Sequence, residues 1–132
     1  MGTEGAAAGA AIRVVLADDD PAFVESLRPL IESQPELDVV ATAGDGLAAI
    51  ELADQLDPDA IVIDLHMPLL DGVTAVARLR RDHPNLCLIA LTGDEAPELG
   101  DAVREAGADA VLFKRDFQER LMERLAAVKA RA

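Results

Sequence analysis

Cysteine and aromatic residues are scarce in this sequence: its 132 residues include one Cys, three Phe, no Trp and no Tyr. A single cysteine excludes an intramolecular disulfide and favours a reducing compartment, so we expect a cytoplasmic protein. Cys87 lies inside the apolar run 86–91, and we expect it to be a small buried core residue. The shortage of aromatic rings argues against base-stacking platforms for single-stranded nucleic acid.

Long apolar segments and an excess of positive charge are also absent. No run has the length of a membrane-spanning helix, and the first ten residues lack the basic start and bulky apolar core of an export signal. The formal net charge of −13 argues against direct binding of a nucleic-acid backbone by this domain. We therefore expect no membrane contact, a disordered tail over 1–11 and one domain over 12–132.

Five short apolar runs alternate with stretches of helical periodicity. Each run is uninterrupted, as is typical of strands buried on both faces of a parallel sheet. The runs span 12–17, 39–41, 60–63, 86–91 and 110–113. Helical spacing relates the sets Phe23/Leu27/Leu30/Ile31, Leu99/Ala102/Val103/Ala106 and Leu121/Leu125/Val128. The last set predicts a helix that continues to the C-terminus.

Local start and stop signals agree with this pattern. Asp20 followed by Pro21 is a helix cap with proline at the first helical position, and Gly107 is a helix stop. Five strand–helix repeats predict an α/β domain with a flavodoxin-like, doubly wound parallel sheet of strand order 2-1-3-4-5. In such a sheet, ligands bind beyond the carboxyl ends of the strands where the order reverses, here between strands 1 and 3.

Aspartates follow both strands at this reversal. Asp18 and Asp19 come directly after the first run, and Asp64 ends the third. Because parallel strands end at the same edge, these carboxylates are expected to converge and repel one another, which a hard divalent cation relieves. We therefore expect a Mg²⁺ site with Asp19 and Asp64 as ligands and Asp18 acting through a water.

Thr92 and Lys114 end the fourth and fifth runs at the same edge. Thr92 offers a hydroxyl donor and Lys114 a fixed positive charge. With an aspartate nucleophile and a metal ion, these groups suit the formation of an acyl phosphate, in which the protein contributes positioning and charge neutralisation. Each residue alone could equally be a cap, a surface charge or a salt-bridge partner, but their convergence on one edge favours phosphoryl transfer.

Five segments of the chain resemble the CheY-like receiver domain of two-component response regulators. They are 14–21 (VVLADDDP), 61–68 (IVIDLHMP), Asp71-Gly72, 91–93 (LTG) and Phe113-Lys114. The intervals of 45 residues from Asp19 to Asp64, 28 to Thr92 and 22 to Lys114 are natural for that family. Residues 45–53 and Pro58-Asp59 also look like its second helix and third strand. The resemblance covers residues 12 to about 130.

This resemblance implies a role for each site residue. Asp64 would be the phosphoacceptor for a histidine kinase. Mg²⁺ would be held by Asp18, Asp19, Asp64 and the main-chain carbonyl of His66, while Thr92 and Lys114 would contact the phosphoryl group. Phosphorylation would draw the threonine inward and change the surface of the helix over 99–106, the strand over 110–113 and the last helix. That change would control partner binding or homodimerisation, in a signalling module rather than a turnover enzyme.

The chain departs from the family pattern in two places. Val111 stands where an aromatic residue commonly swings inward, and a stiff valine cannot do so. Arg115 replaces a common proline, and Lys-Arg-Asp (114–116) resembles the branch that carries a C-terminal helix-turn-helix DNA-binding domain, which implies a role in regulating transcription. His66 and Asp94 occupy positions that flank the route of water to the acyl phosphate and are expected to set its lifetime.

Other interpretations remain open from the sequence. A Mg²⁺-dependent phosphatase with an aspartyl nucleophile is disfavoured because His66, not an acid, stands two residues after Asp64. An interaction module that no longer needs phosphorylation is left open by Val111. A zinc site would need His66 to pair with His83, and Asp20 is a candidate third metal acid or a helix N-cap. Basic residues on the last helix, Arg115, Arg120, Arg124, Lys129 and Arg131, form either a solvated face or a docking surface for an acidic partner.

Overall fold

The computed structural model describes residues 11–93 and 97–128. Its strands are β1 (Ile12–Ala17), β2 (Leu37–Ala43), β3 (Ala60–Asp64), β4 (Cys87–Thr92) and β5 (Ala110–Phe113). Its helices are α2 (Pro21–Glu32), α3 (Gly46–Leu56), α4 (Gly72–Asp82), α5 (Pro97–Ala106) and α6 (Gln118–Ala126). The tail predicted over 1–11 falls almost wholly outside the described residues.

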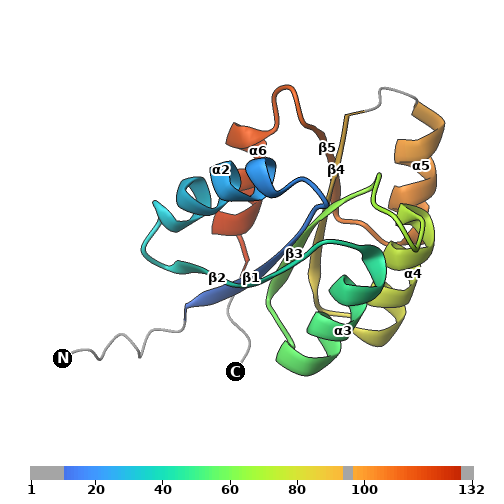
Figure 1. Cartoon of the computed structure of the whole chain (residues 1–132), viewed down its shortest axis with the longest axis horizontal. Coiled ribbons are helices and arrows are strands. Elements are labelled where there is room, and N and C mark those ends of the chain that lie inside the picture. Colours follow the sequence, from blue (N-terminus) through green and yellow to red (C-terminus); the bar gives the residue numbers. More distant parts are fainter. Residues whose placement is uncertain (1–10, 94–96, 129–132) are drawn as a thin grey trace.

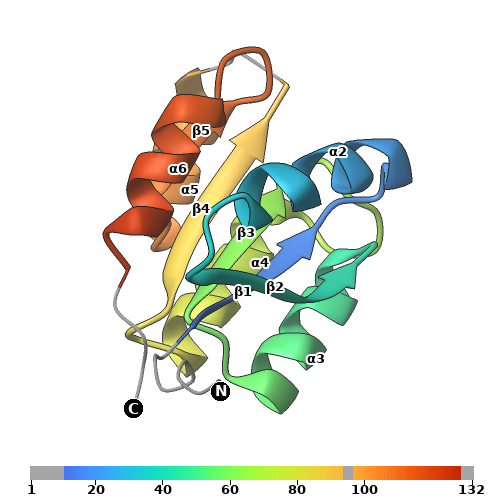
Figure 2. The ribbon, with the colours of Figure 1, turned by 90° about the vertical axis from the view of Figure 1, so that its left-hand side faces the viewer.

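All strand pairs are parallel, and the order in the sheet is β2-β1-β3-β4-β5. The strand arrows visible in Figure 2 run toward the same edge of the sheet. Helices α2 and α6 cover one face, and α3, α4 and α5 cover the other (Figure 1). The predicted fold class and strand order are therefore confirmed. In the described residues, no helix has both the length and the apolar character needed to cross a membrane.

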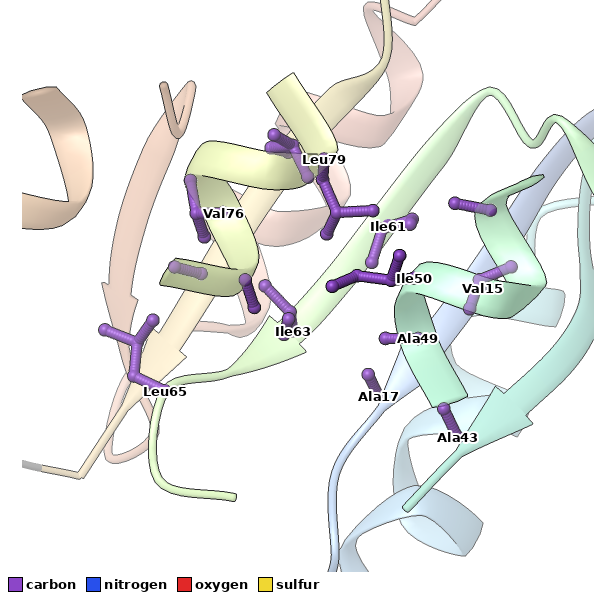
Figure 3. Close-up of a cluster of buried hydrophobic side chains, with 14 of the residues drawn as sticks. Val15, Ala17, Ala43, Ala49, Ile50, Ile61, Ile63, Leu65, Val76 and Leu79 are labelled. Atoms are coloured by element: carbon purple, nitrogen blue, oxygen red, sulfur yellow. The ribbon is translucent and has the colours of Figure 1, made fainter. Parts of the chain in front are cut away.

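Successive side chains of each apolar run point alternately into two hydrophobic cores, one on each face of the sheet. In β3, Ile61 and Ile63 point toward α3 and α4, where Ile61 lies close to Ile50 and Leu79 (Figure 3). Val62 points the other way, into the cluster that includes Leu27 and other residues of α2 and α6. A strand with apolar neighbours on both sides needs no polar face, and for that reason the sequence shows no alternation there.

Three predictions of detail were wrong. β2 is seven residues long rather than three, because it is an edge strand whose exposed residues interrupt the apolar pattern. The last helix ends at Ala126, followed by two described residues outside any helix. Cys87 is half-buried at the start of β4 rather than a fully buried core residue. Burial raises the pKa of its thiol to about 11, which keeps it protonated and unreactive near neutral pH.

Aspartates cap three helices at the edge where the strands end. Asp20 accepts from the Ala22 N–H at 3.0 Å, Asp45 from Ala48 at 2.8 Å and Asp71 from Thr74 at 2.9 Å. Each cap satisfies a backbone donor that has no partner within its helix. The N-cap interpretation of Asp20 is thereby confirmed.

Arg80, near the end of α4, ties together the opposite edge of the sheet. Its guanidinium donates to the carbonyls of Gly107 (3.0 Å), Pro84 (2.8 Å) and Leu86 (2.8 Å) and to Asp109 Oδ2 (2.8 Å). Gly107 has φ +127°, and a Cβ there would lie 2.6 Å from Arg80 Cγ. The helix stop predicted at Gly107 thus has two causes: a left-handed backbone and the space that Arg80 occupies.

Candidate metal and phosphoacceptor site

Three aspartates meet where β1 and β3 end. Asp18, Asp19 and Asp64 each offer a carboxylate oxygen, and these oxygens lie within 4.8 Å of one another. Asp18 and Asp64 are buried, whereas Asp19 is exposed. The backbone holds Asp18 firmly: its N–H donates to the Ala43 carbonyl at 2.9 Å, and its Oδ1 accepts from the Asp20 N–H at 2.9 Å. The sheet therefore gathers the predicted acids at one point.

Lys114, directly after β5, provides the positive charge of the site. Its Nζ lies 2.8 Å from Asp18 Oδ2 and 3.7 Å from Asp64 Oδ2. Burial disfavours the charged ammonium, but the hydrogen bond to Asp18 and the charges of Asp64 and Asp18 outweigh it and raise the pKa of Lys114. Lys114 is therefore a permanent cation between two carboxylates.

The surroundings of Asp64 disfavour its charged form. Burial and the charge of Asp18 raise its pKa above the usual value of 3.8, against the opposing effects of the His66 N–H, Lys114 and His66. Because the pKa of Asp64 is raised in the folded chain, its protonated form stabilises folding. This stabilising contribution is fully present below pH 3.8 and is lost as the pH rises through the folded-state pKa. A metal ion bound beside Asp64 would add to the opposing effect of Lys114 and offset the penalty on the charged form.

The acid group fits a hard divalent cation. Asp18 Oδ2 is buried and, apart from its ion pair with Lys114, accepts no hydrogen bond from the described residues. Among the described residues, only Asp18, Asp19 and Asp64 form a group of three acidic, histidine or cysteine side chains able to hold a metal. Oxygen-only ligands with one exposed member suit Mg²⁺, which keeps several of its waters.

Thr92 and His66 are linked by a contact that sequence reasoning missed. Thr92 is buried at the end of β4, and His66 Nε2 lies 3.1 Å from Thr92 Oγ1. The His66 N–H also donates to Asp64 Oδ1 at 3.2 Å. His66 thus touches the acid cluster through its backbone and the threonine through its ring. Only the side-chain rotamers determine this ring contact, and no sequence pattern signals it.

Phe23 is a second residue whose place was missed. Its ring lies beneath Lys114, with Nζ 4.4 Å from the ring centroid, and it packs against Phe117 at a centroid distance of 5.6 Å. The attraction between an ammonium and a ring face helps to orient the lysine. The helical spacing of Phe23 predicted only a core contact, although its place one turn after Asp20 was a clue to a position near the site.

The remaining predicted residues lie apart from the acid cluster or cannot be placed. Val111 is buried in β5 and pairs in register with Ala90 of β4. His83 follows α4, at the other end of that helix from His66, and its Nε2 lies 2.9 Å from Asp54 Oδ1, so the two histidines do not form the pair that a zinc site would need. Asp94 lies outside the described residues.

Magnesium is expected to stabilise the folded chain. With Mg²⁺ at about ten times its dissociation constant, binding adds roughly 1.4 kcal/mol to the free energy of unfolding. The gain should be larger near pH 7.5 than near pH 5, because a proton on Asp64, whose pKa is raised, competes with the metal. Thermal unfolding with and without Mg²⁺ measures this gain in stability.

The Asp19→Asn variant should lose most of the gain from Mg²⁺. The control is Asp38→Asn, which changes an exposed acid on β2 and should keep the gain. Equal gains in the two variants would contradict a metal site at Asp19.

A family model described as the response regulator receiver domain matches residues 14–126. The nitrate/nitrite response regulator protein NarP of Escherichia coli (strain K12) is 40% identical over 115 residues, which are 87% of this chain and 54% of NarP. The transcriptional regulatory protein DegU of Brevibacillus brevis is 31% identical, over 89% of this chain and 50% of DegU. The chain therefore spans about half the length of these two relatives.

Solved structures agree with this match. The signal receiver domain of the putative response regulator NarL from Mycobacterium tuberculosis superposes with a TM-score of 0.83 at 26% identity, covering 89% of this chain and 94% of that one. The isolated receiver domain of RcsB from Salmonella enterica serovar Typhimurium, with phosphomimetic BeF₃⁻, gives 0.82 at 29% identity, with 89% and 87% covered. The response regulator domain of Thermotoga maritima CheB gives 0.81 at 30% identity, with 88% and 94% covered.

Proposed function

The chain belongs to the response regulator receiver domain family, and we propose that Asp64 accepts a phosphoryl group from a histidine kinase in a Mg²⁺-dependent reaction. The observation that carries the proposal is the position of Asp64: its Oδ2 lies 3.7 Å from the Lys114 ammonium, in a group with Asp18 and Asp19. A buried carboxylate beside a fixed cation and two further acids is a nucleophile with a means of charge balance.

In the proposed transfer, an oxygen of Asp64 attacks the phosphorus of a phosphohistidine. The new O–P bond forms as the P–N bond breaks, and the departing imidazole nitrogen keeps the electron pair. Asp18, Asp19, Asp64 and the His66 main-chain carbonyl would hold Mg²⁺, which when bound neutralises charge on the phosphoryl oxygens. Lys114 contributes a second positive charge, already fixed by its 2.8 Å ion pair with Asp18.

Thr92 is proposed to report the phosphoryl group to the rest of the domain. Its hydroxyl would turn toward a phosphoryl oxygen on Asp64. Thr92 pairs in register with Phe113, and its carbonyl accepts from the Lys114 N–H at 2.9 Å. Movement there would reach β5 and the surface formed by α5, β5 and α6. With Val111 in place of a rotating aromatic, we assign the coupling to Thr92 and its loop.

The output is proposed to be a change in partner binding or homodimerisation that regulates transcription. The similarity to NarP and DegU supports this, as does Lys-Arg-Asp over 114–116. The domain itself would be a cytoplasmic switch rather than a turnover enzyme and would not bind nucleic acid directly. Water attack on the phosphoryl group would end the signal, with His66 and Asp94 setting how fast it does so.

Val111 supports a second candidate, an interaction module that works without phosphorylation. It is buried and β-branched, so it cannot swing as an aromatic residue would. In that case, BeF₃⁻ with Mg²⁺ would leave the amide resonances around Thr92 and Val111 unshifted. The presence of every acid, the threonine and the lysine argues for the first candidate.

Intact mass spectrometry after incubation with acetyl phosphate tests the proposal. We expect one phosphoryl adduct that requires Mg²⁺ and that neutral hydroxylamine removes, because hydroxylamine cleaves acyl phosphates. A sample with EDTA in place of Mg²⁺ is the matched control. If saturating donor and Mg²⁺ give no adduct, the phosphoacceptor function is wrong.

A further inference from the structure

Two of the three phenylalanines in this aromatic-poor chain meet at Lys114. The Phe23 ring lies under the ammonium, with Nζ 4.4 Å from the ring centroid, and the Phe117 ring packs against Phe23 at a centroid distance of 5.6 Å. The third ring, that of Phe113, faces the Arg115 guanidinium at 5.1 Å. The pair at Lys114 therefore places two of the chain's few aromatic rings inside the candidate site.

One short segment of the chain supplies the acids, the helix cap and the ring. After β1, Asp18 and Asp19 join the acid cluster, and Asp20 caps α2. Phe23 follows in the first turn of α2, where the Val24 N–H donates to the Asp20 carbonyl at 3.1 Å. The cap that starts this helix therefore also fixes the backbone of Phe23, directly after the acids.

Phe117 holds the Phe23 ring from a second helix. It is the residue before α6 and is 6% exposed, and its ring plane is tilted by 55° from that of Phe23. Tilted pairs at this centroid distance are a favoured arrangement of aromatic rings. Phe23 is half-buried and packs against the core shared by α2 and α6, which cover the same face of the sheet (Figure 1). A ring held between two helices presents a fixed face to the ammonium.

The Lys114 side chain benefits from such support because it is long and flexible. Its four-carbon stem has many rotamers, and holding the ammonium in one place costs conformational entropy. The side chain is 26% exposed, so water competes for the ammonium. Asp18 Oδ2 lies 2.8 Å from Nζ and Asp64 Oδ2 lies 3.7 Å from it. The ring face restricts the ammonium to positions from which it reaches both carboxylates.

We propose that Phe23 is a positioning residue for the phosphorylation of Asp64: its ring face holds the Lys114 ammonium where it meets the incoming phosphoryl oxygens. This inference rests on the proposed function of Asp64. A cation that is already in place stabilises the developing charge without reorganising during the transfer. Phe23 has no group that reacts or binds a metal, so it acts through Lys114.

A plain core contact is the other role that Phe23 could have, since its helical spacing alone predicts one. Fluorine atoms on the ring distinguish the two roles. They leave the apolar area of the ring almost unchanged, so a core contact would survive. They also withdraw negative charge from the ring face, and that charge is what attracts a cation.

Phosphorylation rates of a fluorinated series test the proposal. Phe23 is replaced site-specifically by mono-, di- and trifluorinated phenylalanine, and by leucine in Phe23→Leu. The same fluorinated series at Phe117 is the matched control, because Phe117 belongs to the same aromatic pair while Phe23 is the ring under the ammonium. Intact mass follows adduct formation with acetyl phosphate and Mg²⁺, and the unfolding temperature of every variant is recorded.

We expect the rate to fall with each fluorine added to Phe23 and to reach about one fifth of the parental rate for the trifluorinated ring and for Phe23→Leu. The fluorinated variants should unfold close to the parental temperature, and the Phe117 series should keep the parental rate within about twofold.

Equal rates across the Phe23 series would overturn the proposal, as would a fall of the same size in the Phe117 series. A rate that followed the unfolding temperature rather than the number of fluorine atoms would also overturn it, because a core contact would then explain the effect. Labelling of the parent chain would stand in each of these cases. A parent chain that accepts no phosphoryl group would instead overturn the phosphoacceptor function, so the two failures are distinguishable.

Discussion

Asp64→Asn is expected to abolish the Mg²⁺-dependent phosphoryl adduct completely. The amide has nearly the same shape as the carboxylate but lacks the negative oxygen that attacks phosphorus. Asp18 is not expected to substitute for it, because its Oδ2 is held by Lys114 at 2.8 Å and its Oδ1 by the Asp20 N–H. Intact mass after saturating acetyl phosphate and Mg²⁺ measures the loss.

Asp71→Asn is the control for this result. Asp71 lies at the same edge as Asp64 but is exposed and caps α4 through Thr74, so its variant should keep the adduct. The Thr74 hydrogen bonds hold the pKa of Asp71 below its usual value, so it is a stable cap and a poor nucleophile. An adduct of parental amount on Asp64→Asn would place the phosphoryl group on another residue and refute the assignment.

The buried strands could be predicted from the sequence more accurately than the edge strand. β1, β3, β4 and β5 were located to within one residue, because runs of four to six apolar and largely β-branched residues bounded by turn residues are typical of strands buried on both faces. β2 has one neighbouring strand, and its exposed Asp38 and Thr42 interrupt the apolar run. Only residues 39–41 of β2 therefore stood out as an apolar run in the sequence. The full length of β2 comes from its pairing with β1, and the hydrophobic pattern of one segment does not show which strand it pairs with.

For the candidate site, topology made the acids predictable. A parallel sheet with this strand order must bring the residues after β1 and β3 together, so Asp18, Asp19 and Asp64 could be grouped without any side-chain geometry. The ring contacts depend on rotamers instead. Phe23 beneath Lys114 and His66 against Thr92 each reflect one choice among several staggered conformations. The residues themselves were visible in the sequence, but their partners were not.

Arg80→Met is expected to lower the free energy of unfolding by about 3 kcal/mol, or roughly 10 °C in the unfolding temperature. The four guanidinium hydrogen bonds join α4 to the segment directly before β4 and to the turn before β5. Asp109 Oδ2 also accepts a hydrogen bond from the Leu88 N–H at 2.8 Å. Methionine fills a similar volume but leaves Asp109 without its cation. Chemical denaturation at constant pH measures the loss.

Arg81→Met, one residue further along α4, is the matched control. Arg81 is exposed, and among the described residues its side chain forms hydrogen bonds and an ion pair only with its neighbour Asp82, so its variant should unfold close to the parental midpoint. Arg80→Lys should recover less than half of the loss, because an ammonium cannot reproduce a planar fork that reaches four acceptors. A parental midpoint for Arg80→Met would contradict the structural role of this network.

Arg80 is expected to contribute to stability without taking part in phosphorylation. Its contacts lie at the edge where the strands begin, whereas Asp18, Asp64 and Lys114 lie at the edge where they end. Below its own unfolding temperature, Arg80→Met should therefore accept phosphate from acetyl phosphate at the parental rate. If the rate fell with the stability, the two edges would be energetically coupled through β4 and β5, and the Thr92 end of β4 would be the place to look for that coupling.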